Sequence, residues 1–573
     1  MQRVLMKCVK LGIPFIIAIA AVKILLVGYD VDEQYAISMS YRLLQGDLLV
    51  AEMWEPHQTS AFLLALLMYP YDLIVGNLTG IVLYLRICGL LMHGLVSICL
   101  YRHLTKYIFK DWLEKEEAKV FAFLIVCVQF FSLPKLMFLP EFSNMQVWFL
   151  LLTVLSFHKY LLLREEKKGT CHLLLAGFWV MLEVLTYPST FFVFAFLVLF
   201  MLFSRKSRFS IKEVVLFVAP GVLGFLLFFA YLLRYIQLQD LGQYISYILD
   251  DGSHGATWSE KLLLNIRSVG EILLYLTVYG LIALFCGLIV RNIKFLKEIS
   301  PFFRNAMLLL VITFAGQMVI WLFGNKYPNY PSVEYFFVLG MGFIFALKEK
   351  LFKDREVVLF LLTPLMAFAG ILAFTNHPVL VSAPFLNVCV TGILIMLVKY
   401  GKNQSCKKII LKAVFALWIL MLLFGKTYLV RVTGGVHYPV FDSVYLIEEG
   451  PAKGIIGDYT AVFGYNERLQ IVKANIPEGA KVFYAGDCTD VYLLGNAQVC
   501  TPSTISTPTF NQRIEEYFKL HPEKLPEYII CDCGLVDFST DSWLMNYVRD
   551  NCHLQPLAEN NYLVVFEMKQ KSE

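Results

Sequence analysis

An acidic cluster in the first third of the sequence could carry acid–base chemistry. Asp32 and Glu33 lie just beyond the apolar run 11–28, and Glu141 follows the apolar run 118–134. Ionised carboxylates are costly in hydrocarbon, so we expect all three at a membrane surface or in a wet cavity there. A carboxylate in a partly desolvated cleft can take a proton from a hydroxyl group. The alternative interpretation is solvated interface charge without a catalytic role.

Basic and aromatic side chains in the same and other predicted outer loops could hold a departing phosphate. These candidates are Arg42, His57, Lys326 and Tyr327. Cationic side chains make strong, charge-assisted hydrogen bonds to phosphate. A base combined with a phosphate-binding group is what the transfer of a sugar from a lipid phosphate requires. Inversion at the anomeric carbon needs one base opposite the leaving group, rather than the close carboxylate pair of a retaining glycosidase.

These residues must be positioned by a helical membrane scaffold. Of the 573 residues, 58% are hydrophobic and only 16% are charged, which is far from the average soluble protein. Apolar runs long enough to cross a bilayer predict about 13 transmembrane helices within residues 1–430. We expect spans at 11–28, 80–100, 118–134, 142–163, two within 172–203, 214–236, 269–290, 306–323, 333–347, 357–374, 379–398 and 409–430.

The first outer loop, residues 29–79, is expected to contain two interfacial helices. Residues 35–44 have amphipathic spacing and are followed by Gly46 and Asp47, which stop helices. Residues 61–76 are apolar but short, and Pro70 and Asp72 interrupt them. Both segments therefore suit a position along the membrane surface, or a re-entrant one for the second.

The distribution of Lys and Arg predicts the topology. Every second loop is basic, namely 102–119, 159–168, 205–212, 291–304, 348–355 and 399–412, as is typical of cytoplasmic loops. The basic N-terminus is expected to be cytoplasmic and to act as an uncleaved signal anchor of a multi-pass plasma-membrane protein. Nucleic acid is a poor fit as a partner, because the cations fall in short loops rather than on one face.

The residues from 431 to 573 form a different kind of region. They carry 11 Lys and Arg against 19 Asp and Glu, and short apolar strands alternate with helical segments. This pattern predicts a small extracytoplasmic α/β domain. Residues 485–490 follow a strand end, where ligands often bind, but no phosphate-binding glycine motif is present. A capping or docking role is therefore favoured over a second catalytic site.

Cysteines and intramembrane charges add further candidates. Five cysteines in the C-terminal region leave the disulfide pairing open, and the Cys531–Cys533 pair lacks the spacing of a zinc site. Glu183 and Glu271 lie within or beside apolar runs, and Arg86 lies inside one. Such charges are functional hypotheses by default, although buried pairing between helices explains them equally well.

The first outer loop resembles that of a known superfamily. It contains DE-x-Y-A from Asp32, RLLxGD from Arg42 and W-x-P from Trp54, followed by a second apolar helix. This pattern is similar to the first outer loop of the GT-C superfamily of membrane glycosyltransferases, and more narrowly to its protein O-mannosyltransferase and aminoarabinose transferase branch. The resemblance covers residues 1–160 and is only architectural beyond them.

The resemblance implies an integral-membrane, inverting glycosyltransferase that moves a sugar from a polyprenyl-phosphate donor to a glycan, lipid or protein acceptor on the outer face. It implies that Asp32 is the catalytic or acceptor-binding acid, with Glu33 beside it and Glu141 as a second acid. The sequence leaves open whether a divalent metal bridges Asp32 and Glu141. Where the branch often has a basic residue and Pro-Pro, this sequence has Glu55-Pro56-His57, so His57 would replace the basic group. Lys326 and Tyr327 echo a later His/Arg-Tyr motif.

Two rival functions remain. A transporter or flippase of lipid-linked glycans would show internal repeats and broken helices at mid-membrane, whereas here the acids cluster at one surface. A non-catalytic membrane scaffold would use the C-terminal domain to bind a partner, and the size of that domain is its main support.

Overall fold

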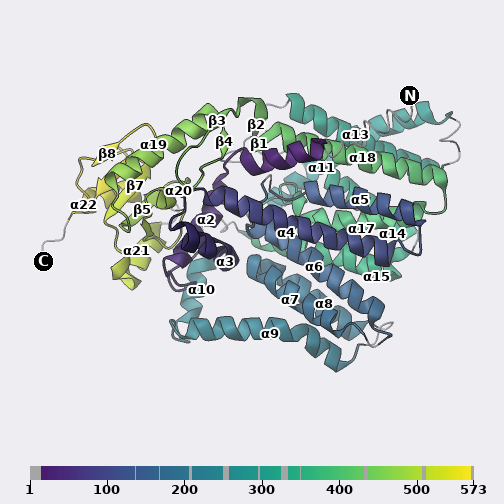
Figure 1. The fold of residues 1–573 in the computed structure, drawn as a ribbon, viewed down its shortest axis with the longest axis horizontal. Coiled ribbons are helices and arrows are strands. Elements are labelled where there is room, and N and C mark those ends of the chain that lie inside the picture. The colour runs from purple at the N-terminus through teal and green to yellow at the C-terminus, as the bar shows by residue number, and fades with distance from the viewer. Residues whose placement is uncertain are drawn as a thin grey trace.

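The chain forms a long helical bundle with a smaller, sheet-containing domain at one end (Figure 1). The computed structural model describes residues 15–569, except 136, 167, 205–208, 250–256, 294–296, 298, 324–332, 349, 432–436 and 506–510. The protein is a polytopic α-helical membrane protein with a small C-terminal α/β domain. The contacts between the bundle and the C-terminal domain are therefore described below.

The apolar runs expected to cross the membrane lie mostly on helices, although residues 379–382 are not helical and residues 11–14 lie outside the described residues. The bundle helices are Phe15–Leu26, α4 Ile81–His103, α5 Lys115–Phe131, α6 Phe142–Leu163, α7 Thr170–Thr186, α8 Phe191–Phe203, α9 Ile211–Leu233, α11 Trp258–Val290, α13 Pro301–Phe323, α14 Val333–Lys348, α15 Arg355–Val357 with α16 Thr363–Phe374, α17 Asn387–Gly401 and α18 Ser405–Tyr428. Among the described residues, nine helices are long and apolar enough to cross a membrane. The other predicted spans are shorter helices.

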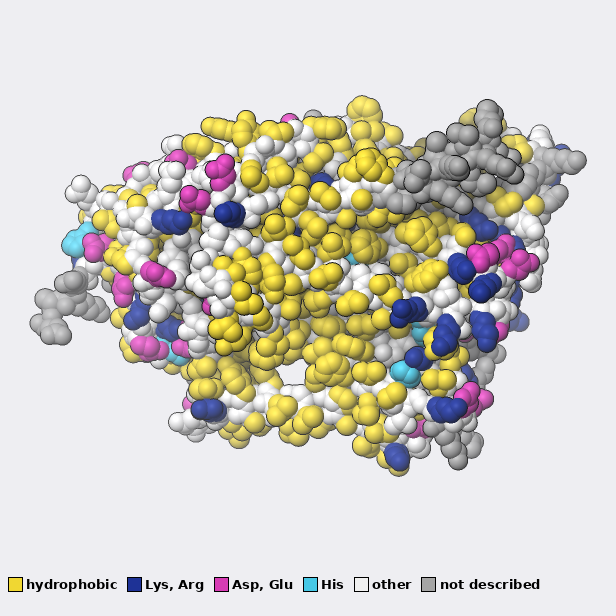
Figure 2. All heavy atoms as spheres, in the orientation of Figure 1, with side chains coloured by type: hydrophobic (Ala, Val, Ile, Leu, Met, Phe, Trp, Pro, Cys, Tyr) yellow, Lys and Arg dark blue, Asp and Glu magenta, His cyan; other side chains and the backbone are white. Residues whose placement is uncertain are grey.

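The outer surface of the bundle suits lipid rather than water. Large apolar side chains of α9 and α11 are exposed, among them Leu223, Phe225, Leu227, Leu281 and Phe285. Figure 2 shows a broad hydrophobic band across the bundle, with Lys and Arg gathered at the end far from the C-terminal domain. A soluble protein does not expose apolar area on this scale, so this band marks the membrane-embedded part.

The first outer loop contains two helices, as expected. α2 (Val31–Leu44) starts with a capping box between Asp30 and Glu33, which satisfies backbone N–H groups that a helix start leaves unpaired. α3 (Gln58–Val75) contains Pro70 and ends at Gly76, whose φ of 73° suits glycine. By length and composition α3 is also one of the nine helices able to cross a membrane.

The position of α2 differs from the expected one on the membrane surface. All ten residues from Glu33 to Arg42 are buried, whereas an interfacial helix keeps one face in water. The reason is that the C-terminal domain covers α2 (Figure 1). Ser38 donates a hydrogen bond to the carbonyl of Thr489 at 2.8 Å, and Tyr41 donates one to Oδ1 of Asn496 at 2.6 Å.

The C-terminal domain is built on a five-stranded mixed sheet with strand order β6-β5-β7-β9-β8. β5 (Lys481–Ala485) is parallel to β6 (Gln498–Val499) and β7 (Tyr528–Asp532), while β9 (Leu563–Glu567) is antiparallel to β7 and β8 (Ala558–Glu559). Its helices are α19 Tyr459–Asn475, α20 Asp490–Leu494, α21 Asn511–Leu520 and α22 Trp543–Asn551, and the short strands β1 Leu429–Arg431, β2 His437–Pro439, β3 Tyr445–Leu446 and β4 Ile456–Gly457 precede the sheet. All five cysteines expected here are free thiols, so the structure forms no disulfide among them.

The short helix α10 (Leu241–Leu249) carries the aromatic residues Tyr244 and Tyr247. The structure places Tyr247 of α10 on Trp54 of the first outer loop, with ring centroids 4.3 Å apart and the rings stacked. Trp54 in turn packs against Tyr517 of α21, at 5.2 Å and edge to face. The aromatic face therefore joins α10, the first outer loop and the C-terminal domain.

Candidate active site

The first turn of α2 presents Asp32 toward a lysine from a distant loop. Asp32 Oδ2 lies 2.5 Å from Nζ of Lys135, in the loop between α5 and α6. The side chains are 30% and 17% exposed, respectively, so another molecule can reach both groups. The backbone carbonyl of Lys135 accepts a hydrogen bond from Lys426 of α18 at 2.7 Å, which fixes the lysine's own loop against the bundle.

Glu33 points the other way and holds α2 to the bundle. Its two carboxylate oxygens lie 2.8 Å from Nε and 2.5 Å from Nη2 of Arg86, on α4. Arg86 also donates to the backbone carbonyls of Leu25 and Gly28, and both charged side chains are buried. This bidentate pair engages both oxygens of the carboxylate and ties the first turn of α2 to α4.

Glu141 begins α6 and is buried next to the same lysine. As the N-cap it accepts hydrogen bonds from the backbone N–H groups of Ser143 at 2.9 Å and Asn144 at 2.7 Å. Burial raises the pKa of Glu141 to about 7; the charge of Lys135 opposes this rise and that of Asp32 adds to it. Lys135 and Asp32 are thus the charged side chains that influence Glu141.

The raised pKa of Glu141 predicts a pH-dependent stability. Between pH 4.5 and 7 the folded protein binds a proton that the unfolded chain releases, so the free energy of unfolding falls as pH rises through this window. The shift corresponds to roughly 3 kcal/mol. We expect the apparent Tm of the detergent-solubilised protein to fall from pH 5 to pH 8, and Glu141→Gln to remove much of that fall.

The control for this titration is Glu559→Gln, because Glu559 is an exposed glutamate of the C-terminal domain. It should leave the pH dependence of the apparent Tm unchanged. A Glu141→Gln protein with the same fall in apparent Tm as the wild type would show that Glu141 does not titrate in this window.

A glycine on α4 makes room for the loop that carries Glu141. A Cβ placed on Gly89 would lie 1.6 Å from the backbone oxygen of Phe138. The same loop is held by Asn144, whose Nδ2 donates to the carbonyls of Met137 at 3.0 Å and Leu139 at 2.9 Å. The start of α6 and the surface of α4 therefore fix the loop from both sides.

Gly89→Ala is expected to push this loop away and to lower stability by about 1–3 kcal/mol, which is typical of overpacking. Gly94→Ala on the same helix is the matched control, because a Cβ there meets no atom within 4 Å. Apparent Tm values of the two purified variants provide the measurement. Equal values would mean that α4 can move away from the loop without cost.

An aromatic wall lies beside the charged group. The ring of His57 stacks on Phe142, with centroids 4.0 Å apart and an interplanar angle of 3°, and its centroid lies 5.0 Å from that of Tyr187. Nζ of Lys135 is 6.0 Å from the Phe142 ring centroid. Burial raises the pKa of Tyr187, and the charge of Glu141 raises it further. His57 thus packs on Phe142, the residue that follows Glu141.

Arg42, a predicted phosphate contact, is committed to other partners. Its guanidinium is fully buried, 2.7 Å from Oδ2 of Asp47 and 3.3 Å from Oε1 of Glu55. It also donates to the carbonyls of Glu52 at 2.8 Å and Pro502 at 3.3 Å. Asp47, Glu52 and Glu55 belong to the first outer loop, and the Pro502 contact joins this loop to the C-terminal domain. Lys326 and Tyr327 lie outside the described residues.

Lys135 and Tyr187 are the site residues that the sequence did not single out. Lys135 had a visible signal, because it is a cation in the segment LPKLMFLPE, within an outer loop where few positive charges were expected. Tyr187 had a weaker one, at the turn between two apolar runs. Neither signal predicts which residue is contacted, because Lys135 pairs with Asp32, which lies in another loop region of the sequence.

A metal that bridges Asp32 and Glu141 would share these carboxylates with partners that they already have. An ammonium group already lies 2.5 Å from Asp32, and both oxygens of Glu141 accept backbone hydrogen bonds. Among the described residues, the group of ligand atoms close enough to hold an ion contains neither acid. The positive charge that the structure places at Asp32 is the Lys135 ammonium.

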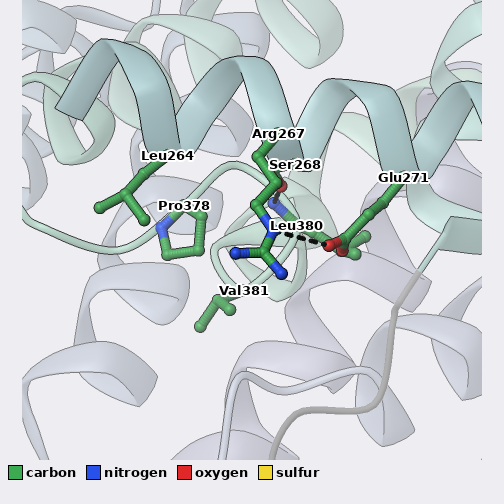
Figure 3. A pocket seen from close by; sticks show the side chains of 7 residues that line it. All are labelled: Leu264, Arg267, Ser268, Glu271, Pro378, Leu380 and Val381. Carbon is green, nitrogen blue, oxygen red and sulfur yellow. Dashed lines mark hydrogen bonds and ion pairs between the residues drawn. The ribbon is translucent and has the colours of Figure 1, made fainter. Parts of the chain in front are cut away.

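The other intramembrane charges have local partners. Glu183 of α7 accepts a hydrogen bond from Gln146 of α6 at 3.4 Å. Glu271 of α11 pairs with Arg267 one turn earlier, at 3.8 Å. This pair borders an open pocket of about 240 Å³ between α11 and the loop that follows α16 (Figure 3). Its lining residues, Leu264, Arg267, Ser268, Glu271, Pro378, Leu380 and Val381, include none of the Asp32 group.

Comparison with known proteins gives likenesses of structure alone. No protein-family model matches the chain, and no curated protein matches it. ArnT from Cupriavidus metallidurans is similar in structure. Its apo form has a TM-score of 0.42 and 11% identity over 98% of both chains, and its complex with undecaprenyl phosphate has 0.45 and 10% over 97% of both.

The Archaeoglobus fulgidus oligosaccharyltransferase, solved in complex with Zn and sulfate, has a TM-score of 0.37 and 13% identity over 88% of this chain. The chain spans only 64% of that protein's length. Both neighbours are GT-C glycosyltransferases, the superfamily that the first outer loop resembles. Every TM-score lies below 0.5, so a function must be argued from the site itself.

Proposed function

We propose that the protein is an inverting glycosyltransferase that moves a sugar from a polyprenyl-phosphate donor to an acceptor hydroxyl at the outer membrane surface. The observation that carries this proposal is the contact between the Asp32 carboxylate and the Lys135 ammonium, with Glu141 buried beside them. A proton acceptor and a phosphate-binding cation are the two groups that the reaction requires.

Asp32 acts as the base in this proposal. It removes the proton of the acceptor hydroxyl as that oxygen attacks the anomeric carbon, and the bond from this carbon to the phosphate oxygen breaks. The lipid phosphate leaves as an anion, and Lys135 donates hydrogen bonds to it. In the resting protein the same lysine pairs with Asp32. Binding of the donor therefore turns Lys135 toward phosphate and frees the carboxylate.

The surroundings support this division of roles. Phe142 and Tyr187 belong to an apolar cluster with Tyr35, Met39 and Ile371, and the Phe142 ring centroid lies 6.0 Å from Nζ of Lys135. An apolar setting on this side strengthens charge interactions. Glu141, with a pKa of about 7, can hold a proton close to Asp32. Arg86 pairs with Glu33 and thereby holds the first turn of α2, which carries Asp32, against α4.

The outer-face assignment rests on the placement of charges. The bundle end that carries most of its Lys and Arg lies opposite the C-terminal domain (Figure 2), and cytoplasmic loops collect these residues. The N-terminus is then cytoplasmic, while the Asp32 group and the C-terminal domain are extracytoplasmic. The acceptor can be a cell-envelope glycan, a glycolipid or a protein.

A vesicle assay separates this function from transport. Purified protein is reconstituted with a polyprenyl-phosphate donor labelled in both the sugar and the lipid, and membrane extracts supply the acceptor. We expect labelled sugar to appear on acceptor and free polyprenyl phosphate to accumulate. Recovery of intact donor on both faces of the vesicle, without cleavage of the sugar–phosphate bond, would instead establish a transporter.

A further inference from the structure

A second cluster of ligating side chains lies where the first outer loop meets the C-terminal domain. Glu52 follows α2, while His521 and Glu523 follow α21. One ligand atom from each lies within 4.8 Å of those of the other two. The side chains of Glu52 and His521 are 15% and 13% exposed, and that of Glu523 is 61% exposed. The cluster is thus largely enclosed, with one open side through which an ion can enter.

The orientation of His521 is the unusual feature of this cluster. Nε2 of His521 lies 3.0 Å from the backbone carbonyl of Ala51, to which it donates its proton. In the neutral ring, Nδ1 then carries a lone pair, yet it faces Oε1 of Glu523 at 3.2 Å. Two acceptors this close repel each other unless a cation lies between them or the ring is doubly protonated.

The surroundings hold the ring in this orientation. His521 packs against Tyr517, with ring centroids 4.9 Å apart, and Tyr517 packs against Trp54. A histidine that donates one ring N–H to a backbone carbonyl and turns the other nitrogen toward carboxylates has the arrangement of most metal-ligating histidines. With metal–ligand bonds of about 2.1 Å, a 3.2 Å separation corresponds to an angle of about 100° at the metal, close to tetrahedral.

We propose that Glu52, His521 through Nδ1, and Glu523 bind a divalent transition metal of the zinc type, which ties the first outer loop to the C-terminal domain. One imidazole and two carboxylates suit zinc, and water completes the coordination. The site is separate from Asp32 and Glu141, and does not depend on the proposed transferase activity.

Lys524 is the group that opposes metal binding. Its Nζ lies 2.5 Å from Oδ1 of Asp47 and 3.3 Å from Oε1 of Glu52, so its charge repels an incoming cation. The other oxygen of Glu52 accepts a hydrogen bond from the backbone N–H of Leu48 at 2.7 Å. Each carboxylate oxygen has two lone pairs, and Glu52 therefore keeps capacity for a metal next to Lys524.

Zinc titration of the full-length, chelator-treated protein in detergent tests the proposal. We expect one equivalent of bound Zn²⁺ by calorimetry, and affinity that falls at least tenfold in His521→Ala and in Glu52→Gln. Lys524→Ala should bind zinc more tightly than the wild type. The control is His553→Ala, an exposed histidine of the same domain, which should bind like the wild type.

Two results would contradict the proposed zinc site. Absence of saturable zinc binding, or equal affinity in the wild type and His521→Ala, would show that these three side chains do not form a metal site. Size-exclusion profiles of all variants confirm that they are folded. Since the readout is metal binding, failure of this proposal is distinguishable from failure of the sugar transfer.

Discussion

Asp32→Asn is expected to lower kcat for sugar transfer by about 10²–10⁴-fold, the contribution that a positioned general base makes. An amide keeps the size of the carboxyl group but cannot accept the proton of the acceptor hydroxyl. The apparent Tm should change little, because a partly exposed ion pair contributes about 0–1 kcal/mol. Initial rates with labelled donor, together with thermal denaturation of the same samples, provide the measurement.

The control for this variant is Asp537→Asn, which changes an exposed carboxylate of the C-terminal domain and should transfer sugar at the wild-type rate. If Asp32→Asn retains wild-type kcat while remaining folded, the base lies elsewhere. Because Glu141 is buried beside it, Glu141→Gln should then be measured under identical conditions to locate the base.

Lys135→Met is expected to lower kcat by about 10²–10³-fold, as the loss of one group that stabilises developing negative charge does in other enzymes. Methionine keeps the length of the side chain but cannot neutralise the leaving phosphate. The variant also leaves Asp32 without its ammonium partner. A larger effect on kcat than on the KM of the donor would indicate that the contact is made mainly in the transition state.

Two comparisons make this second test specific. Lys453→Met replaces an exposed lysine and should have no effect on transfer. The double variant with Asp32→Asn should lose much less than the product of the two single effects, since groups that act together are strongly non-additive. If the fold-loss in kcat of the double variant equals the product of the two single losses, Lys135 and Asp32 act in independent steps.

The membrane helices could be predicted because their physical signal is local. α6 spans Phe142–Leu163, the expected run, and the break at Tyr187 separates α7 from α8 as predicted. α11 begins at Trp258, well before the expected 269, because a capping box between Thr257 and Glu260 starts a polar extension of the helix. Hydropathy detects apolar runs and misses such an extension.

The candidate site could be predicted only in part, because its contacts are not local. The acids Asp32 and Glu141 were found from their places beyond apolar runs, since the bilayer dictates where charge can lie. The partner of each acid depends on how helices pack in space. Lys135 for Asp32 and Arg86 for Glu33 come from other loops and helices. The burial of Arg42 between two acids likewise depends on the docked C-terminal domain.

The packing of α2 against both the bundle and the C-terminal domain has a consequence for how the two regions evolve. One side of this helix is fixed to the bundle through Arg86, and the other to the C-terminal domain through Ser38 and Tyr41. A chimaera that joins this bundle to the C-terminal domain of a homologue would leave buried hydroxyl groups facing foreign backbone. The two regions must therefore evolve as a matched set, and recombination between them should succeed only where the crossover carries α2 together with the domain that covers it.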